Sequence, residues 1–310
     1  MIDISKLSKS YGSTLAVNGV SLKIDKGSLF GLLGPNGAGK TSLINAICGL
    51  TAADRGEIRM GSTLCRGTWP KEVRAGFGLV PQELAFYDNY SARDNVRFFG
   101  SLYGLRGKEL SLATDEALAF VGLEDSGKKP AKSFSGGMKR RLNIACGIVH
   151  RPNIVIMDEP TVGIDPQSRN HILSSIEALH KRGITLVYTT HYMEEAERLC
   201  TEIAIMDKGT IIAQGSPDEL KILVRDVAAL SLRLTSPQAV DLTAFRTITG
   251  VKHAVLEENN LTISSDVHTN NLPLIMTEAL KQKLFFTAIH SDSPSLEDVF
   301  LDLTGRSLRD

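Results

Sequence analysis

The sequence predicts an α/β fold in which helices flank a parallel or mixed sheet, followed by a small α+β module. Three observations lead to this prediction. Apolar strand patterns alternate with helical patterns along most of the chain, which is typical of a sheet covered by helices on both faces. A glycine-rich loop joins an apolar strand at 29–33 to a helical pattern at 43–50. The pattern changes after Gly215-Ser216-Pro217, and we expect two domains, 1–222 and 223–310.

Two segments near the N-terminus, residues 2–4 and 20–24, alternate apolar and polar side chains. Alternation is typical of antiparallel strands with one buried face. We therefore expect a small antiparallel lobe ahead of the main sheet, with residues 56–59 as a further short strand.

Continuous apolar runs predict strands that are buried on both faces, as in a parallel sheet. These runs are residues 29–33, 77–80, 154–157 and 184–188. Apolar side chains at helical spacing predict helices after Ser91, over 112–121, after Ser135 and over 167–181. A hairpin at 203–213 would close the domain.

The last part of the chain predicts a small α+β module. Residues 230–234 and 261–264 alternate as strands do, and a helix at 271–283 precedes an apolar segment at 285–289. The final segment, 295–305, carries Leu296, Val299, Phe300 and Leu303 at helical spacing. A helix packed on its own module explains that spacing, and the module shows no catalytic pattern.

The composition limits the partners of the chain. Lys and Arg number 35, as do Asp and Glu, so no basic field favours a nucleic acid, and we expect no such partner. The N-terminus lacks the pattern of a signal peptide, and no window holds the ~20 apolar residues that span a bilayer. Four scattered cysteines without a C-x-x-C pair suggest a reducing compartment. We therefore expect that, if the chain works at a membrane, another protein holds it there.

The segment from Gly34 to Thr41, GPNGAGKT, lies between a predicted strand and a predicted helix. This is the context that a phosphate-binding P-loop needs. Its glycines let the backbone N–H groups surround an anion at a helix N-terminus. Lys40 would reach the β- and γ-phosphates, and the Thr41 hydroxyl would bind Mg²⁺. The alternative, a glycine-rich turn without a ligand, is less favoured, and we predict nucleotide binding.

Asp158 and Glu159 follow the apolar run 154–157. They therefore lie at the carboxyl end of a parallel strand, where ligands bind in such sheets. Asp158 suits Mg²⁺, directly or through water, and Glu159 suits a general base that activates an attacking water. By itself the pair is also compatible with a solvated strand end, but beside a P-loop it predicts phosphoryl transfer.

Ser135-Gly136-Gly137 precedes a helix whose first turn contains Lys139, Arg140 and Arg141. A serine cap, exposed glycine N–H groups and the helix dipole together form a possible anion site. The alternative is an ordinary capped helix, and the motif alone favours that alternative. The basic first turn opposes the dipole, so isolated helix stability does not account for it.

Across residues 1–222 the chain resembles the ATP-binding subunits of ABC transporters. The matching residues, in the order of the family's motifs, are Gly34 to Thr41 (Walker A), Gln82 (Q-loop), Ser135-Gly136-Gly137 (signature), Asp158 and Glu159 (Walker B and its following glutamate), Gly163-Ile164-Asp165 (D-loop) and His191 (switch histidine), with Tyr11 as the aromatic that stacks on adenine.

The resemblance implies a helical subdomain that carries the signature motif, and it also implies a full set of site residues. The expected catalytic residues are Lys40, Glu159 and His191, and the expected Mg²⁺ ligands are Thr41, Gln82 and Asp158. The expected nucleotide-binding residues are Tyr11, Gly34, Pro35, Asn36, Gly37, Ala38, Gly39, Lys40, Thr41, Ser42, Ser135, Gly136 and Gly137. Gln82 and Asp165 would couple the site to neighbouring subunits.

In that family two ATP-binding domains pack head to tail, with ATP between the Walker A of one and the signature of the other. The resemblance therefore implies a second copy of this chain, or a related subunit, as partner. It also implies an integral membrane permease and a place on the cytoplasmic face of the inner or plasma membrane. Phe86 and Tyr87, which follow the Q-loop, are either anchors for that permease or a local cluster.

Two features resemble the daunorubicin-resistance type of exporter ATPase. The signature reads Phe134-Ser-Gly-Gly-Met138 where the family commonly has Leu and Gln, and the tail 295–305 is similar to that of the subgroup. The tail would be a regulatory or dimer-supporting appendage. We expect an ATPase that exports a drug, lipid, polysaccharide or other small molecule.

Two alternatives remain: a soluble ABC-type ATPase that acts on the ribosome or DNA, and a solitary regulatory ATPase. The short acidic segment after His191, with Glu194, Glu195 and Glu197, we interpret as a solvated helix face.

Overall fold

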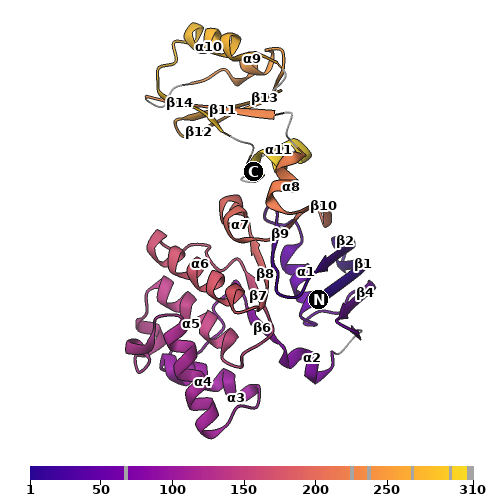
Figure 1. The fold of residues 1–310 in the computed structure, drawn as a ribbon, viewed down its shortest axis with the longest axis vertical. Coiled ribbons are helices and arrows are strands. Elements are labelled where there is room, and N and C mark those ends of the chain that lie inside the picture. The colour runs from indigo at the N-terminus through magenta and orange to yellow at the C-terminus, as the bar shows by residue number, and fades with distance from the viewer. Residues whose placement is uncertain (66–68, 224–226, 236–238, 267–268, 293–294, 306–310) are drawn as a thin grey trace. The chain divides into compact units, whose positions relative to one another are not determined.

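The computed structural model describes residues 1–65, 69–223, 227–235, 239–266, 269–292 and 295–305. The chain forms two compact units, Met1–Ser216 and Pro217–Asp310 (Figure 1). Residues 217–222, which the sequence analysis assigned to the first domain, thus belong to the second unit. Each unit is described by itself.

A small antiparallel sheet forms the expected lobe of the first unit. Its order is β2-β1-β4-β5, from strands β1 (Ile2–Tyr11), β2 (Thr14–Ile24), β4 (Arg55–Met60) and β5 (Thr63–Cys65). β1 is longer than predicted, because its register with β2 shifts between Ile4 and Leu7, and Lys6 has a φ of 48°. Such a bulge interrupts the alternation on which the prediction depended.

The main sheet is mixed, as predicted. Its order is β10-β9-β3-β8-β7-β6, and its strands are β3 (Leu29–Leu33), β6 (Phe77–Val80), β7 (Ile154–Asp158), β8 (Thr185–Thr190), β9 (Glu202–Asp207) and β10 (Thr210–Gly215). All neighbours are parallel except β9 and β10, which form the expected hairpin. Since β3, β8 and β7 are adjacent, the loops that follow them meet at one edge.

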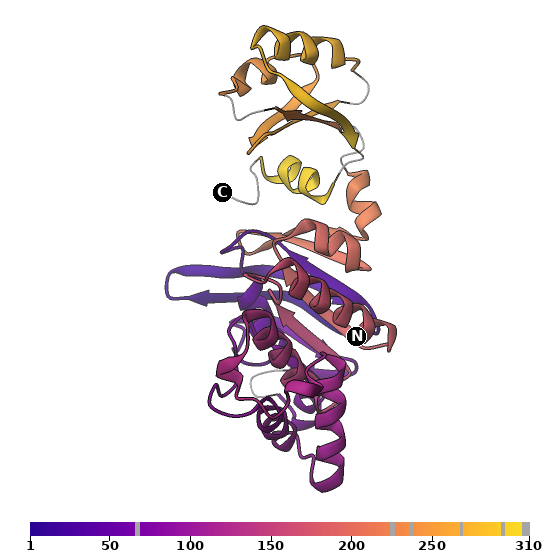
Figure 2. The same cartoon turned by 90° about the vertical axis from the view of Figure 1, so that its left-hand side faces the viewer.

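Helices cover the main sheet and form the expected helical subdomain (Figures 1 and 2). The helices of this unit are α1 (Lys40–Ile47), α2 (Lys71–Ala75), α3 (Ala92–Leu102), α4 (Gly107–Phe120), α5 (Gly136–Ile148), α6 (Pro166–Lys181) and α7 (Met193–Leu199), with 3₁₀ turns at Glu124–Ser126 and Ala131–Ser133. α3, α4 and α5 pack on one another. Among the described residues, no helix is long and apolar enough to cross a membrane.

The core of the first unit lies where the small sheet, the main sheet and α1 meet. It is built from apolar side chains that are almost fully buried, among them Ile4, Leu22, Phe30, Leu43 and Val187. Because α1 and β3 are both part of this core, the loop between them is held at both ends.

The second unit has a β-α-β-β-α-β order like that of the ferredoxin-like motif. Its elements are α8 (Pro217–Ile222), β11 (Val227–Leu234), α9 (Leu242–Arg246), β12 (Val251–Glu257), β13 (Asn260–Asp266), α10 (Leu272–Lys281), β14 (Phe286–Asp292) and α11 (Leu296–Thr304). The antiparallel sheet has the order β12-β13-β11-β14. Thus the predicted α+β class is confirmed, with α9 and β12 as additional elements.

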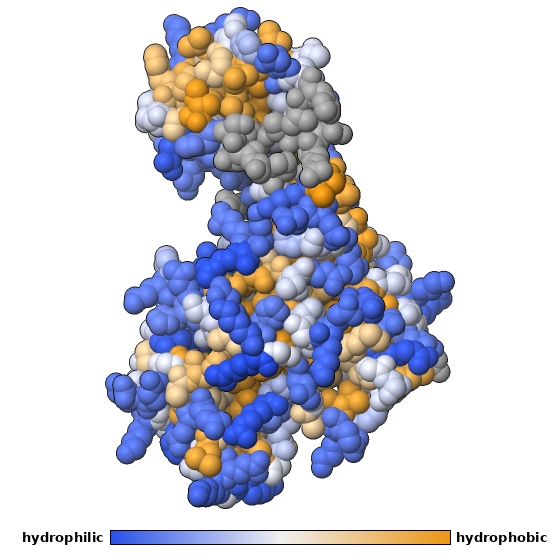
Figure 3. Space-filling view, viewed as in Figure 1, coloured by the Kyte–Doolittle hydropathy of each residue, from blue (hydrophilic) through white to orange (hydrophobic). Residues whose placement is uncertain are grey.

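Helices α9 and α10 lie on one face of this sheet and α11 lies on the other (Figures 1 and 2). A core of its own includes Leu232, Phe245 and Leu261. Leu296, Val299 and Phe300 of α11 are buried, whereas Leu303 is exposed, so the predicted packed helix uses three of its four apolar positions. Hydrophobic side chains gather on one face of this unit, while the visible face of the first unit is largely hydrophilic (Figure 3).

Candidate functional site

The loop between β3 and α1 requires glycine at two tightly packed positions. Gly39 has a φ of 104°, and a Cβ added there would lie 2.2 Å from the carbonyl oxygen of Ala16. At Gly34 an added Cβ would lie 2.2 Å from the carbonyl oxygen of Met206. Both glycines therefore let the loop pack against neighbouring backbone, which holds the loop in place ahead of Lys40.

Lys40, the first residue of α1, is buried and surrounded by acceptors. Its Nζ donates to the carbonyl oxygens of Gly34, at 2.8 Å, and Pro35, at 3.1 Å. The same nitrogen lies 3.3 Å from Oε1 of Glu159, which is also buried. The structure thus pairs the P-loop lysine with the glutamate that follows β7.

Glu159 is the point where the predicted catalytic segments converge. The Gln82 amide Nε2 lies 3.4 Å from Oε2 of Glu159, and Nδ1 of His191 lies 3.6 Å from the same oxygen. Glu159 itself has a φ of 46°, a left-handed conformation that costs energy for a residue with a side chain. Lysine, glutamine and histidine from three separate segments of the chain therefore surround one carboxylate.

Asp158 is held beside the P-loop by two hydroxyl groups. Thr41 Oγ1 donates to Oδ2 at 3.0 Å, and Thr189 Oγ1 donates to Oδ1 at 2.6 Å. The Thr189 hydroxyl also accepts the backbone N–H of Glu159 at 2.9 Å. Thr189 therefore orients both acidic residues.

Sequence reasoning missed Thr189, although one signal was present. It directly follows the apolar run of the predicted strand 184–188, and it is the register partner of Asp158 in the parallel pair β7–β8. Strand adjacency, which the sequence does not state, makes that position a neighbour of Asp158.

A cavity of about 480 Å³ opens over this loop. The predicted site residues that line it are Asn36, Gly37, Ala38, Gly39, Lys40, Thr41, Ser42, Gln82 and Glu159. Sequence reasoning missed the other lining residues, which come from the β1–β2 hairpin and the β9–β10 turn: Thr14, Leu15, Ala16, Lys208 and Gly209. The P-loop and the acidic strand end thus share one cavity.

Nine predicted site residues do not line this cavity, namely Tyr11, Gly34, Pro35, Ser135, Gly136, Gly137, Asp158, Asp165 and His191. Tyr11 is 48% exposed at the end of β1, where Lys9 Nζ lies 5.5 Å from its ring centroid, and it pairs with Thr14. Ser135 caps α5 by accepting the N–H of Met138 at 3.3 Å, and Gly136 and Gly137 begin that helix. Within one chain, the signature segment and the P-loop cavity are therefore separate.

Asp165, the predicted coupling residue, caps α6 by accepting the Ser168 N–H at 2.9 Å. Hydrogen bonds from Ser168 lower the pKa of the Asp165 carboxyl. A Cβ added at Gly137 would lie 3.4 Å from Asp165 Oδ2 and 2.0 Å from Ser168 Oγ. The start of α5 is therefore packed directly against the start of α6, and Gly137 is required for that approach.

Arg140, in the basic first turn of α5, contacts the Q-loop. Arg140 Nη1 donates to the carbonyl oxygens of Pro81, at 3.1 Å, and Gln82, at 2.7 Å. Burial lowers the pKa of the Arg140 guanidinium. Asn143 Nδ2 also donates to the Pro81 carbonyl, at 3.2 Å. These side chains hold the backbone of the Q-loop on the helix that begins with the signature segment.

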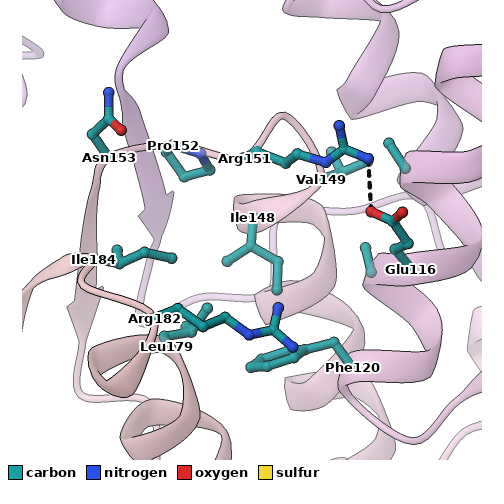
Figure 4. A pocket seen from close by; sticks show the side chains of 12 residues that line it. Glu116, Phe120, Ile148, Val149, Arg151, Pro152, Asn153, Leu179, Arg182 and Ile184 are labelled. Carbon is teal, nitrogen blue, oxygen red and sulfur yellow. Dashed lines mark hydrogen bonds and ion pairs between the residues drawn. The ribbon is translucent and has the colours of Figure 1, made fainter.

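A second hollow, of about 320 Å³, lies among α4 and the ends of α5 and α6 (Figure 4). Arg151 is paired there with Glu116, and the Arg182 guanidinium lies over the Phe120 ring. No predicted site residue lines it. It adjoins the residues just before β7 and β8, at the opposite ends of the strands from Glu159, whereas ligands of such sheets bind at the carboxyl ends.

The comparisons with known proteins identify the family of the chain. The sequence model of the ABC transporter family matches residues 17–162. The linearmycin resistance ATP-binding protein of Bacillus subtilis (strain 168) is 40% identical over 312 residues, which cover 100% of both chains. The chain belongs to the family of ABC transporter ATP-binding subunits. Such a subunit hydrolyses ATP to drive transport.

Other members of the ABC family extend the comparison. The Nod factor export ATP-binding protein I of Paraburkholderia xenovorans (strain LB400) is 35% identical, over 100% of this chain and 98% of its own. The solved cbiO1 protein of Clostridium perfringens, described as part of an ABC transporter complex, matches with a TM-score of 0.65 and 29% identity, over 71% of this chain and 89% of its own. A bacterial ABC transporter cassette solved as a dimer shares the fold, with a TM-score of 0.65 over 70% of this chain and 98% of its own.

Proposed function

We propose that this ABC subunit hydrolyses ATP at the P-loop cavity with Glu159 as the general base. The observation that carries the proposal is the convergence of Lys40, Gln82 and His191 on the Glu159 carboxylate. Lys40 binds the phosphates, Glu159 accepts a proton from the attacking water, and His191 helps to position that water. Phosphoryl transfer depends mainly on such positioning and on charge stabilisation.

Mg²⁺ fits the oxygen donors beside the P-loop, namely the Thr41 hydroxyl, the Asp158 carboxylate and the Gln82 amide. In the described part of the chain, no three or more His, Cys, Asp or Glu side chains are grouped to hold a metal by themselves. Mg²⁺ is commonly held by one or two carboxylates together with substrate phosphates. It would therefore enter with ATP and neutralise phosphate charge.

The complete site also needs a partner. Ser135, Gly136 and Gly137 do not line the P-loop cavity of their own chain, and an exposed serine cap with glycine N–H groups suits a phosphate. We propose that a second copy, or a related ATP-binding subunit, presents this segment to the nucleotide, with Tyr11 stacking on adenine. Asp165, at the start of the adjoining α6, would couple the two sites.

An exposed aromatic surface follows the Q-loop and suits a membrane permease. Tyr87 and Tyr90 are about half exposed, Leu84 is also exposed, and the Tyr87 ring packs 5.3 Å from the rings of both Tyr90 and Phe98. The two interpretations, a local cluster and a set of interface anchors, are therefore compatible, because the same rings pack together and remain accessible. Aromatic side chains of this kind are typical interface anchors. We propose a place on the cytoplasmic face of the membrane.

The full-length relatives suggest the direction of transport. They are named for linearmycin resistance and Nod factor export, and the signature variant and the tail resemble the daunorubicin-resistance type. We therefore propose export of a drug, lipid, polysaccharide or other small molecule. Because the names of these relatives concern resistance and export, we favour transport over the alternative of an ATPase that acts on the ribosome.

The test of this function is Glu159→Gln, which keeps the shape of the side chain and removes the base. A general base contributes ~10²–10⁴-fold to the rate, so we expect turnover to fall by that factor while ATP still binds and the protein elutes as an ATP-dependent dimer. Glu116→Gln, on the exposed side of α4, is the matched control and should keep its turnover. Rapid hydrolysis by purified Glu159→Gln would exclude this role.

The same variant can capture the membrane partner. We expect Glu159→Gln with ATP and Mg²⁺ to copurify a polytopic membrane protein in stoichiometric amount from detergent-solubilised native membranes. Copurification of ribosomal components instead would favour the soluble alternative.

A further inference from the structure

Glu195 lies on α7, just after the switch histidine, and is only 5% exposed. The prediction of a solvated face is wrong for this residue. Met193, Ala196 and Leu199 are buried on the same helix, whereas the neighbouring Glu194 is exposed. A buried carboxylate is costly unless it is paired and hydrogen-bonded, so the partners of Glu195 indicate its role.

Three hydroxyl groups donate to one oxygen of this carboxylate. The Tyr188 hydroxyl, Thr161 Oγ1, at 2.9 Å, and Thr190 Oγ1, at 3.2 Å, all donate to Oε2. Burial and the charge of Glu195 raise the pKa of Tyr188 well above its ordinary value, so the phenol keeps the proton that it donates. On the other oxygen, Arg169 Nε of α6 lies 3.1 Å from Oε1 as an ion pair.

Two of these partners lead to His191. The Thr190 hydroxyl, which donates to Glu195, accepts the backbone N–H of Tyr192 at 2.9 Å, so it spans the turn that carries the histidine. The Arg169 guanidinium lies 4.2 Å from the centroid of the Tyr192 ring, and that ring lies 4.3 Å from the His191 ring. Glu195 is thus linked to the backbone beside His191 through Thr190, and to the ring of His191 through Arg169 and Tyr192.

A third partner leads to the general base. Thr161 lies two residues after Glu159, is fully buried, and donates to Glu195. Between Thr161 and β7, Glu159 holds its left-handed backbone, which persists only where the surroundings impose it. Glu195 itself does not line the P-loop cavity.

We propose that Glu195 is a positioning residue for ATP hydrolysis: its buried carboxylate holds the turn that carries His191 and the turn that follows Glu159 in their catalytic arrangement. The inference rests on the proposed function of these two residues. Glu195 contacts neither nucleotide nor water in this role, so it affects the rate of the chemical step and leaves ATP affinity unchanged.

The first test is Glu195→Gln, which keeps the size of the side chain and removes the charge that pairs with Arg169. A displacement of about 1 Å in a catalytic group costs ~10²-fold, so we expect kcat per ATP-binding site to fall by roughly 10- to 100-fold. The dissociation constant for ATP should stay within about twofold. Glu194→Gln, one residue away on the exposed face, is the matched control and should keep the kcat of the unsubstituted protein.

Titration of ATP-binding sites separates positioning from folding. If Glu195 only stabilises the fold, the variant has a lower melting temperature and fewer ATP-binding sites, but each remaining site turns over at the normal rate. A normal kcat per site in Glu195→Gln would therefore overturn the proposal.

A second pair of variants tests the same contact if Glu195→Gln does not fold. Thr190→Ser keeps the hydroxyl between Glu195 and Tyr192 and should retain most of kcat. Thr190→Val has nearly the same shape without the hydroxyl and should lose about as much kcat as Glu195→Gln. Equal kcat per site in the two variants would overturn the proposal.

The outcome is distinguishable from a failure of the proposed function. If Glu159→Gln hydrolyses ATP rapidly, the assignment of the general base fails, and the inference fails with it. If Glu159→Gln is inactive and Glu195→Gln is normal, only the inference fails.

Discussion

At the scale of single residues, the site is organised by buried charges that satisfy one another. Lys40 is neutralised by Glu159 and by two loop carbonyl groups, and Asp158 accepts two hydroxyl groups. Removing one partner of a buried pair leaves the other uncompensated, which is strongly destabilising. A substitution that removes only one partner of such a contact would therefore also destabilise the fold.

We expect Lys40→Ala to reduce nucleotide affinity, because the lysine side chain of a P-loop donates hydrogen bonds to the phosphates. Hydrogen bonds to charged groups contribute about 1.5–3 kcal/mol, so we expect ATP binding to weaken by roughly 10- to 100-fold in equilibrium titrations. Lys26→Ala, in the exposed turn before β3, is the matched control and should bind ATP normally. Unchanged affinity in Lys40→Ala would refute the role of this lysine.

The motifs predicted Lys40, Gln82 and His191 as site residues, because each lies in a recognisable local pattern, but they did not predict that all three surround Glu159. They did not predict the residues that hold those patterns in place. Thr189, Arg140 and Glu195 are all buried, and each contacts residues that are distant along the chain, which the local sequence does not show. Glu194 and Glu195, adjacent and chemically identical, have opposite environments.

At the scale of secondary structure, the strongest predictions concerned elements with uniform burial. β3 is buried at every residue, and its predicted bounds match the observed ones. β1 extended beyond its predicted end because a bulge at Lys6 interrupts the alternation. β12 was missed, since its residues are mostly only partly buried and its apolar pattern is correspondingly weak.

The last helix, α11, begins with a capping box that can be tested. Ser295 Oγ accepts the Asp298 N–H at 3.2 Å, and Asp298 Oδ2 accepts the Ser295 N–H at 2.8 Å. Loss of a serine cap typically costs ~1 kcal/mol. We expect Ser295→Ala to lower the free energy of unfolding of the second unit by about that amount in denaturant titrations.

Asp302→Ala, on the exposed part of the same helix, is the control for this change. Its carboxylate lies in the last turn, where a negative charge opposes the helix dipole, so its removal should cost nothing. If both variants lose the same stability, the capping box does not stabilise α11.

At the scale of the whole molecule, each compact unit has its own hydrophobic core. We infer that each unit is a domain that unfolds in its own transition. Phe245 is fully buried in the core of the second unit. Replacing such a side chain by alanine typically costs about 3–5 kcal/mol of stability.

Differential scanning calorimetry should therefore resolve two transitions. Phe245→Ala is expected to lower the transition of the second unit alone, while ATP with Mg²⁺ raises that of the first unit alone, since a ligand stabilises only the state that binds it. A single transition that moves with both changes would show that the chain unfolds as one cooperative unit.

By itself the sequence determined the fold class, the P-loop and the acidic strand end, because each depends on residues that are close together along the chain. Only the tertiary structure decided which of these segments meet. Thr41 and Asp158 are separated by 117 positions and are joined by one hydrogen bond, because β3 and β7 flank β8 in the sheet. Strand order depends on the packing of the whole core, so contacts between distant loops, including those of Glu195, follow from the folded molecule and not from local pattern.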